Sequence, residues 1–156
     1  MKTVLYIYGK GGNASESTHY ERLFPNFKVI GLDYKTFSPW ETGKEIHDAV
    51  VSLKTEFESI ILIANSIGAF FSMNANLNWQ VPTSILYGEN DNLTSLETIK
   101  DFAEKQGATL TVMKGGEHWF HTEEEMNFLD EWIRGQSVFT IHDNKDRCFQ
   151  NVRPSF

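Results

Sequence analysis

Three residues that can carry out nucleophilic catalysis stand directly after apolar runs in this chain. Ser66 follows "SIILIA" in the stretch "ANSIG", one substitution from the G-x-S-x-G turn that exposes a serine between a strand and a helix. A carboxylate follows the next apolar run, at Glu89 or Asp91, and His118 follows the last, in "GGEHWF". A serine at a helix N-cap is the simpler interpretation of Ser66 alone. Serine, carboxylate and histidine in this order predict a triad for acyl transfer.

The glycines of "YIYGKGGNAS" allow a second interpretation. Gly9, Gly11 and Ala14 match the dinucleotide fingerprint G-x-G-x-x-[GA], and Asp33 lies about 20 residues further on. A cofactor loop needs a helix that starts at its glycines with an N-terminus open to pyrophosphate. Here a polar stretch follows instead, and Glu16 would bring negative charge near the phosphates. Nicotinamide binding is therefore the weaker hypothesis.

The elements that position these residues alternate between strand-like and helical patterns. Alternation of this kind predicts a mainly parallel sheet with helices on both faces, a three-layer α/β sandwich. The run "SIILIA" is almost wholly apolar, which is typical of a central strand. Five strands are expected, over residues 3–8, 27–31, 59–64, 83–87 and 109–113.

Capping signals mark the starts of three helices. Ser38 with Pro39 and Glu41 predicts one that ends near residue 57. Thr94 with Glu97 opens a second, which Gly107 closes, and Thr122 with Glu125 opens a third. Their apolar stripes are expected to face the core.

The alternation fails from residue 135 onward. We expect residues 1–134 to form one domain and residues 135–156 to be a tail of unknown role. Within the tail, Val138 to His142 is strand-like and could extend a sheet edge. The choice among an edge strand, an interaction segment and disorder stays open.

The stretches "YIYGKGGN", "IANSIGAF", "LYGENDN" and "GGEHWF" together resemble the alpha/beta hydrolase family over residues 1 to about 133. The resemblance implies Ser66 as nucleophile, His118 as general base and acid, and Asp91 as the third member. Asp91 is preferred because family members usually read G-x-x-D after this strand. Glu89 is the fallback.

The same resemblance gives the first loop a role. In the family, the turn after the first core strand and the residue after the nucleophile each donate a backbone N–H to the oxyanion. These donors would be Lys10 and Ile67 here. Tyr8 stands where the family usually has His, which leaves the backbone donor in place.

One core strand and the cap of the family are missing between the serine's helix and the strand that bears the acid. The resemblance then implies strand order 2-1-3-4-5, with the acid-bearing strand beside the nucleophile's strand. Whether the triad closes in this arrangement is open. Absence of a cap predicts a shallow, open site.

Composition limits the possible partners and compartments. A net charge of -7 argues against nucleic-acid or anionic-membrane binding. The single Cys148, the absence of a signal-peptide pattern and the lack of an 18-residue apolar run favour a cytoplasmic protein. The oligomeric state is not indicated.

We therefore expect a serine hydrolase, carboxylesterase-like, that acts on a small ester or related acyl compound without metal or organic cofactor. A catalytically silent binding protein of the same fold is the alternative, and a flavodoxin-like or Rossmann-like nucleotide-binding module is a weaker one.

Overall fold

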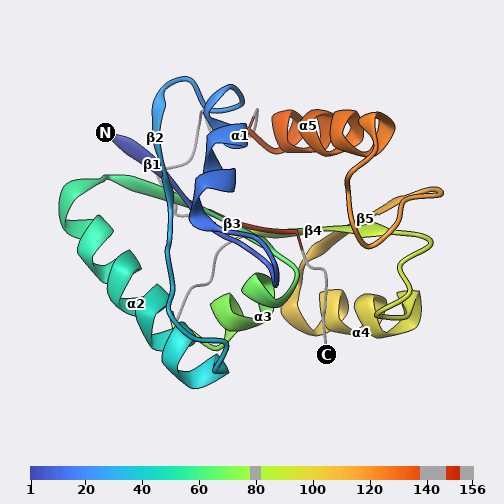
Figure 1. Cartoon of the computed structure of the whole chain (residues 1–156), viewed down its shortest axis with the longest axis horizontal. Coiled ribbons are helices and arrows are strands. Elements are labelled where there is room, and N and C mark those ends of the chain that lie inside the picture. Colours follow the sequence, from blue (N-terminus) through green and yellow to red (C-terminus); the bar gives the residue numbers. More distant parts are fainter. Residues whose placement is uncertain (78–81, 138–146, 152–156) are drawn as a thin grey trace.

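The computed structural model describes residues 1–77, 82–137 and 147–151 of the chain. In this part of the chain, six parallel strands alternate for the most part with helices (Figure 1). The strands are β1 (Lys2–Ile7), β2 (Phe27–Gly31), β3 (Ser59–Asn65), β4 (Thr83–Gly88), β5 (Thr109–Met113) and β6 (Arg147–Asn151). The α/β class and the five expected strands are confirmed.

The sheet order is β2-β1-β3-β6-β4-β5, so the prediction of a five-stranded sheet in which β4 lies beside β3 is wrong. Strands β2, β1 and β3 form one group, and β4 pairs with β5 in another. β6 joins the groups, because it pairs with β3 from Ile61↔Arg147 to Asn65↔Asn151 and also with β4. A segment of the tail thus occupies the position of the missing strand. The expected strand at Val138 to His142 lies outside the described residues.

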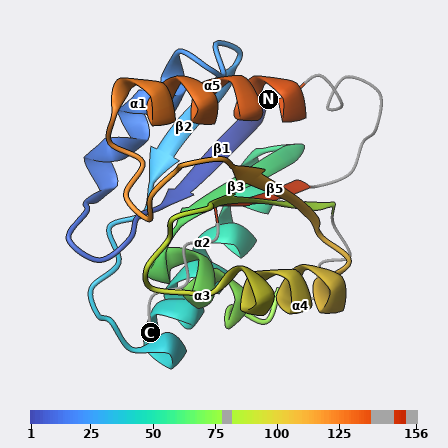
Figure 2. The same cartoon turned by 90° about the vertical axis from the view of Figure 1, so that its right-hand side faces the viewer.

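Helices cover both faces of the sheet (Figures 1 and 2). The short helices η1 (Ala14–Ser17) and α1 (Thr18–Glu21) lie with α5 (Glu123–Ser137) on one face. The opposite face carries α2 (Pro39–Glu56), α3 (Ile67–Met73) and α4 (Leu96–Gln106). In β3, Ile60 to Ala64 are at most 2% exposed, which confirms the central position predicted from their apolar run.

The capping signals gave two helix starts correctly and one with an error of one residue. Ser38 accepts a hydrogen bond from the Glu41 amide at the start of α2, and Thr122 and Glu125 form a reciprocal capping box at α5. Helix α4 is capped by Ser95 and not by Thr94, because the Ser95 hydroxyl accepts from the Thr98 amide. None of the described helices is both long and apolar enough to cross a membrane.

Candidate active site

Ser66 occupies a strained turn between β3 and α3. Its φ of 53° and ψ of -129° lie in a region that residues with a Cβ rarely adopt, and its side chain is buried. The chain is closely packed around this turn. A Cβ on Gly68 would lie 2.4 Å from the carbonyl oxygen of Tyr8, and one on Gly9 would lie 2.9 Å from the Ser66 Cβ. The small residues of the "ANSIG" motif and of the first loop therefore bring that loop against Ser66.

Ser66, His118 and Asp91 form a chain of contacts across the carboxyl ends of β3, β4 and β5. The Ser66 Oγ lies 3.4 Å from Nε2 of His118, and Nδ1 of His118 lies 2.7 Å from Oδ2 of Asp91. An ionised carboxylate can only accept, so Nδ1 carries the proton and the lone pair of Nε2 faces the serine hydroxyl. This tautomer is the one that a general base for Ser66 requires. Both the His118 and Asp91 side chains are at most 2% exposed.

Asp91 is held in place by its own loop. Its second oxygen, Oδ1, accepts hydrogen bonds from the backbone amides of Leu93 and Thr94 at 2.8 and 3.1 Å. Glu89, the fallback candidate, instead accepts from the amide of Gly115 at 2.9 Å and is exposed. The structure therefore brings Asp91, and not Glu89, to His118.

The loop that carries His118 is fastened by Glu125, a residue that sequence analysis treated only as a helix cap. Its Oε1 accepts from the amide of Glu117, and its Oε2 accepts from the amides of His121 and Thr122 and from the Thr122 hydroxyl. Burial raises the pKa of the Glu125 carboxyl, but these hydrogen bonds outweigh it and lower the pKa to about 2. Glu125 is thus ionised at neutral pH and positions both flanks of His118.

The first loop is supported by a pair of tyrosines. The Tyr8 and Tyr34 rings stack with centroids 4.2 Å apart, and each hydroxyl donates to the other residue's backbone carbonyl. Burial raises the pKa of both phenols, so both remain donors at neutral pH. Tyr8, which departs from the family pattern, fixes the loop that contains Lys10.

The geometry of this loop does not suit a dinucleotide. Helix η1 is a single short 3-10 turn, and α1 after it has four residues, so no long helix presents its N-terminus to a pyrophosphate. The Glu16 carboxylate lies 2.8 Å from where a Cβ on Gly12 would stand, so it places negative charge against the loop. No three His, Cys, Asp or Glu side chains in the described ranges come together in a way that could hold a metal ion.

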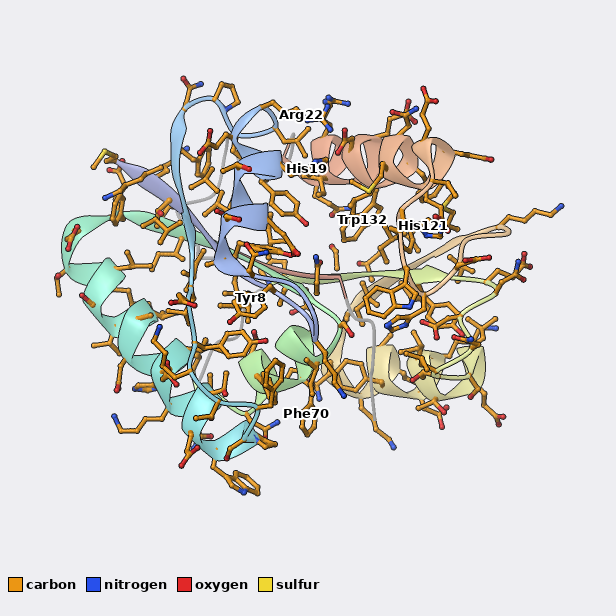
Figure 3. The ribbon with its side chains drawn as sticks, in the orientation of Figure 1. Tyr8, His19, Arg22, Phe70, His121 and Trp132 are labelled. Atoms are coloured by element: carbon orange, nitrogen blue, oxygen red, sulfur yellow. The ribbon has the colours of Figure 1, made fainter. Side chains whose placement is uncertain are left out.

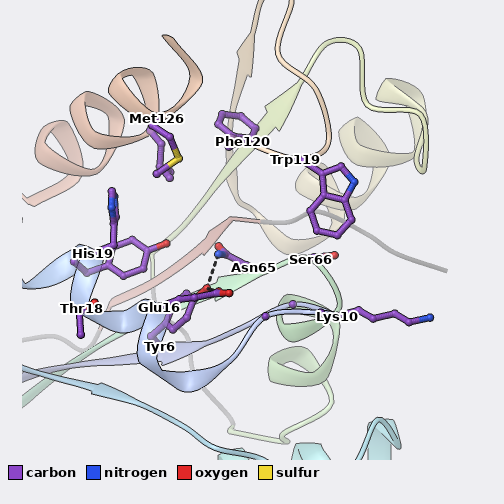
Figure 4. A pocket seen from close by; sticks show the side chains of 15 residues that line it. Tyr6, Lys10, Glu16, Thr18, His19, Asn65, Ser66, Trp119, Phe120 and Met126 are labelled. Atoms are coloured by element: carbon purple, nitrogen blue, oxygen red, sulfur yellow. Dashed lines mark hydrogen bonds between the residues drawn. The ribbon is translucent and has the colours of Figure 1, made fainter. Parts of the chain in front are cut away.

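A cavity of about 490 Å³ opens beside Ser66 (Figure 4). One wall is polar and contains Tyr6, Glu16 and Asn65, which are joined by hydrogen bonds of 2.8 Å. The other wall is mostly apolar and consists of Trp119, Phe120, Met126 and Leu129. A cavity of this size accommodates a small molecule.

Helices α1 and α5, which border the cavity, are linked by charged side chains. Asp130 of α5 is buried and accepts from His19 Nε2 at 2.8 Å and from the Arg22 guanidinium. Figure 3 shows His19 and Arg22 projecting from the α1 side toward α5. This contact links α1 to α5, two helices whose residues line the cavity.

The predicted site residues come together as follows. Ser66, His118 and Asp91 are in contact, Lys10 lines the cavity beside Ser66, and Ile67 is the first residue of α3. The roles of Tyr34, Glu125 and Asn65 were not predicted from the sequence. The capping box marked Glu125, but nothing in the sequence indicated that its carboxylate also reaches Glu117.

Comparison with solved structures identifies the fold family of this chain. No family model and no curated protein matches the sequence. An alpha-beta serine hydrolase homologue from Coxiella burnetii superposes with a TM-score of 0.69 at 15% identity, covering 87% of this chain and 84% of its own. A serine hydrolase without a lid from Xanthomonas campestris gives 0.66 at 17% identity, with 91% and 83% covered. The carboxylesterase of Bacillus cereus gives 0.60 at 16% identity, with 86% and 88% covered. This chain therefore has the alpha/beta hydrolase fold.

Proposed function

We propose that this protein is a serine hydrolase that cleaves small carboxylic esters or related acyl compounds. The observation that carries the proposal is the alignment of the Ser66 hydroxyl, the His118 imidazole and the buried Asp91 carboxylate, with Ser66 in a strained strand-to-helix turn. Fold alone does not determine chemistry, but a nucleophile, a base and an orienting acid at the strand ends are the groups that acyl transfer needs.

In the proposed reaction, the Ser66 Oγ attacks the acyl carbon while His118 Nε2 takes its proton. Asp91 stabilises the imidazolium that forms, and the backbone N–H groups of Lys10 and Ile67 hold the negative charge on the carbonyl oxygen. His118 then gives the proton to the leaving alcohol, and the acyl group stays on Ser66. Water, deprotonated by His118, attacks this acyl-enzyme and releases the acid and the free serine.

The contact of 3.4 Å between Ser66 and His118 is compatible with this role, because such hydrogen bonds often shorten only when substrate is bound. The neighbouring cavity of about 490 Å³ favours a small substrate. The similarity to serine hydrolases and to a carboxylesterase supports the same reaction class.

Labelling with a fluorophosphonate probe tests the proposal directly. The unmodified protein should be labelled and should hydrolyse p-nitrophenyl butanoate, whereas Ser66→Ala should do neither. Ser52→Ala, which removes an exposed hydroxyl from α2, is the matched control and should behave as the unmodified protein does. Equal labelling of Ser66→Ala, or a folded protein without any labelling, would refute the proposal and favour a silent binding protein.

A further inference from the structure

The polar wall of the cavity contains a buried acceptor that the triad does not use. Asn65, the residue before Ser66, has a side-chain Oδ1 that is buried and has no hydrogen-bond partner among the described residues. Leaving such an oxygen unpaired costs about 1 to 3 kcal/mol. An orphaned acceptor at a cavity wall points to a donor that arrives with a ligand.

The orientation of the Asn65 amide follows from its neighbours. Burial, followed by Tyr20 and Glu16, raises the pKa of the Tyr6 phenol, so its hydroxyl keeps its proton at neutral pH. That proton is donated to the Glu16 carboxylate, and the Tyr6 oxygen accepts from Asn65 Nδ2. The amide nitrogen of Asn65 is therefore turned to Tyr6, and its oxygen is the free acceptor.

Glu16 supplies a negative charge to the same wall. Both Glu16 and Asn65 line the cavity and bind the one hydroxyl of Tyr6, so their carboxylate and amide groups are close neighbours. In Figure 4, the Asn65 amide lies between the Tyr6 and Glu16 side and the Phe120 and Met126 side. The Glu16 carboxylate and the Asn65 amide thus belong to the polar wall of a cavity whose opposite wall is mostly apolar.

The positively charged side chains near the cavity do not neutralise the negative charge of the Glu16 carboxylate. The side chain of Lys10 extends away from the cavity in Figure 4. The Arg22 guanidinium is paired with the buried carboxylate of Asp130, which offsets its charge, and His19 Nε2 lies 2.8 Å from the same carboxylate. A cation is thus the ligand group that best fits the polar wall, and an ammonium can donate to Asn65 and Glu16 at once.

We propose that this cavity selects acyl substrates that carry an ammonium group on the acyl chain, which Asn65 Oδ1 and the Glu16 carboxylate bind while the chain's methylenes pack on Phe120 and Met126. The inference rests on the proposed hydrolase function and assigns its substrate class. Asn65 and Glu16 are specificity determinants in it and take no part in bond breaking.

Matched pairs of p-nitrophenyl esters test the substrate class. Esters of glycine, β-alanine and 6-aminohexanoic acid are each compared with the isosteric propanoate, butanoate and heptanoate. Since an ammonium also activates an ester electronically, each kcat/KM is divided by the ester's rate with hydroxide, and the Ser66→Ala protein supplies the blank. The corrected preference for ammonium is expected to reach about tenfold for at least one pair, the scale of a charge-assisted hydrogen bond.

Variants of the polar wall are expected to change the corrected ratio of kcat/KM between the ammonium ester and its isosteric partner. Glu16→Gln and Asn65→Leu should each lower it about tenfold. Glu21→Gln, which removes the same charge from an exposed position on α1 outside the cavity lining, should leave it within about twofold. A preference of one or less with active enzyme, or equal ratios in all variants, would overturn the inference and leave the hydrolase function standing.

Binding without turnover provides a second readout. On Ser66→Ala protein, calorimetric titration should show n-hexylammonium binding about tenfold more tightly than 1-hexanol, and the additional Glu16→Gln change should remove the difference. If the protein hydrolyses no ester, the hydrolase function fails, and this titration still decides whether the cavity binds an ammonium group. Equal affinity for the two probes would overturn it.

Discussion

Glu125 is expected to stabilise the folded protein through the loop that carries His118. The carboxylate is 4% exposed and accepts four hydrogen bonds, from three backbone amides and the Thr122 hydroxyl. A glutamine has the same shape but one acceptor oxygen, and its NH₂ group would face donors. Glu125→Gln therefore leaves at least one buried amide unpaired.

The magnitude follows from the pKa of Glu125, which falls from an ordinary 4.5 to about 2 in the folded protein. That difference corresponds to about 3 kcal/mol of stabilisation by the charged form. Because the folded-state pKa is the lower one, the stabilisation is fully present above about pH 4.5 and is lost as the pH falls toward 2.

Urea unfolding followed by tryptophan fluorescence measures the effect. At pH 7, Glu125→Gln should reduce the free energy of unfolding by about 3 kcal/mol. Between pH 4.5 and 3 the unmodified protein should lose stability more steeply than the variant, since the variant has no carboxylate to protonate there. Glu124→Gln, at an exposed position one residue earlier on α5, should change stability by less than about 0.5 kcal/mol. Equal stability of Glu125→Gln and the unmodified protein at pH 7, or parallel pH profiles, would refute the reasoning.

Three further changes test the site and the sheet. Asp91→Asn should lower kcat for ester hydrolysis by about 10³- to 10⁴-fold, because Asp91 orients His118. Glu89→Gln should lower kcat by less than about fivefold. Equal losses in the two variants would contradict the assignment of Asp91 as the acid. Gly68→Ala should lower the free energy of unfolding, measured in urea, by more than about 3 kcal/mol, because the new Cβ would lie 2.4 Å from a backbone oxygen. Gly135→Ala in α5 is the control and should be neutral or slightly stabilising, because open space surrounds Gly135. Termination after Ser137 removes β6 and should abolish probe labelling of Ser66 together with the cooperative unfolding transition; retained labelling would show that the two strand groups align without it.

Local signals predicted much of this fold. The strands β1 to β5 were recognisable because each is a short apolar run between helical patterns. Ser38 and Thr122 marked helix starts because their hydroxyls satisfy backbone donors in the same turn. The location of Ser66 and His118 at one edge of the sheet could be expected because carboxyl ends of parallel strands meet there, whereas their direct contact depends on the strand order and was left open.

Features that depend on residues far apart in the sequence could not be predicted from local signals. Strand β6 lies in a tail that shows no alternation of strand and helix, and its place depends on pairing with residues far away in the sequence, such as Ile61. The bond from Glu125 to the Glu117 amide and the acceptor on Asn65 depend on how loops approach in space. The residue types show that a carboxylate or an amide is present, but which groups it binds depends on the tertiary structure.

The position of β6 has a consequence for how the chain folds. The strand that closes the middle of the sheet is the last of the six to be synthesised, so the nascent chain holds two half-sheets with unpaired inner edges until residue 151 has been made. Pairings between segments so distant in sequence form slowly, and exposed strand edges promote association with other chains. We therefore expect refolding to be slow and prone to aggregation at high protein concentration, with the Ser66 hydroxyl and the His118 imidazole reaching each other only in its final step.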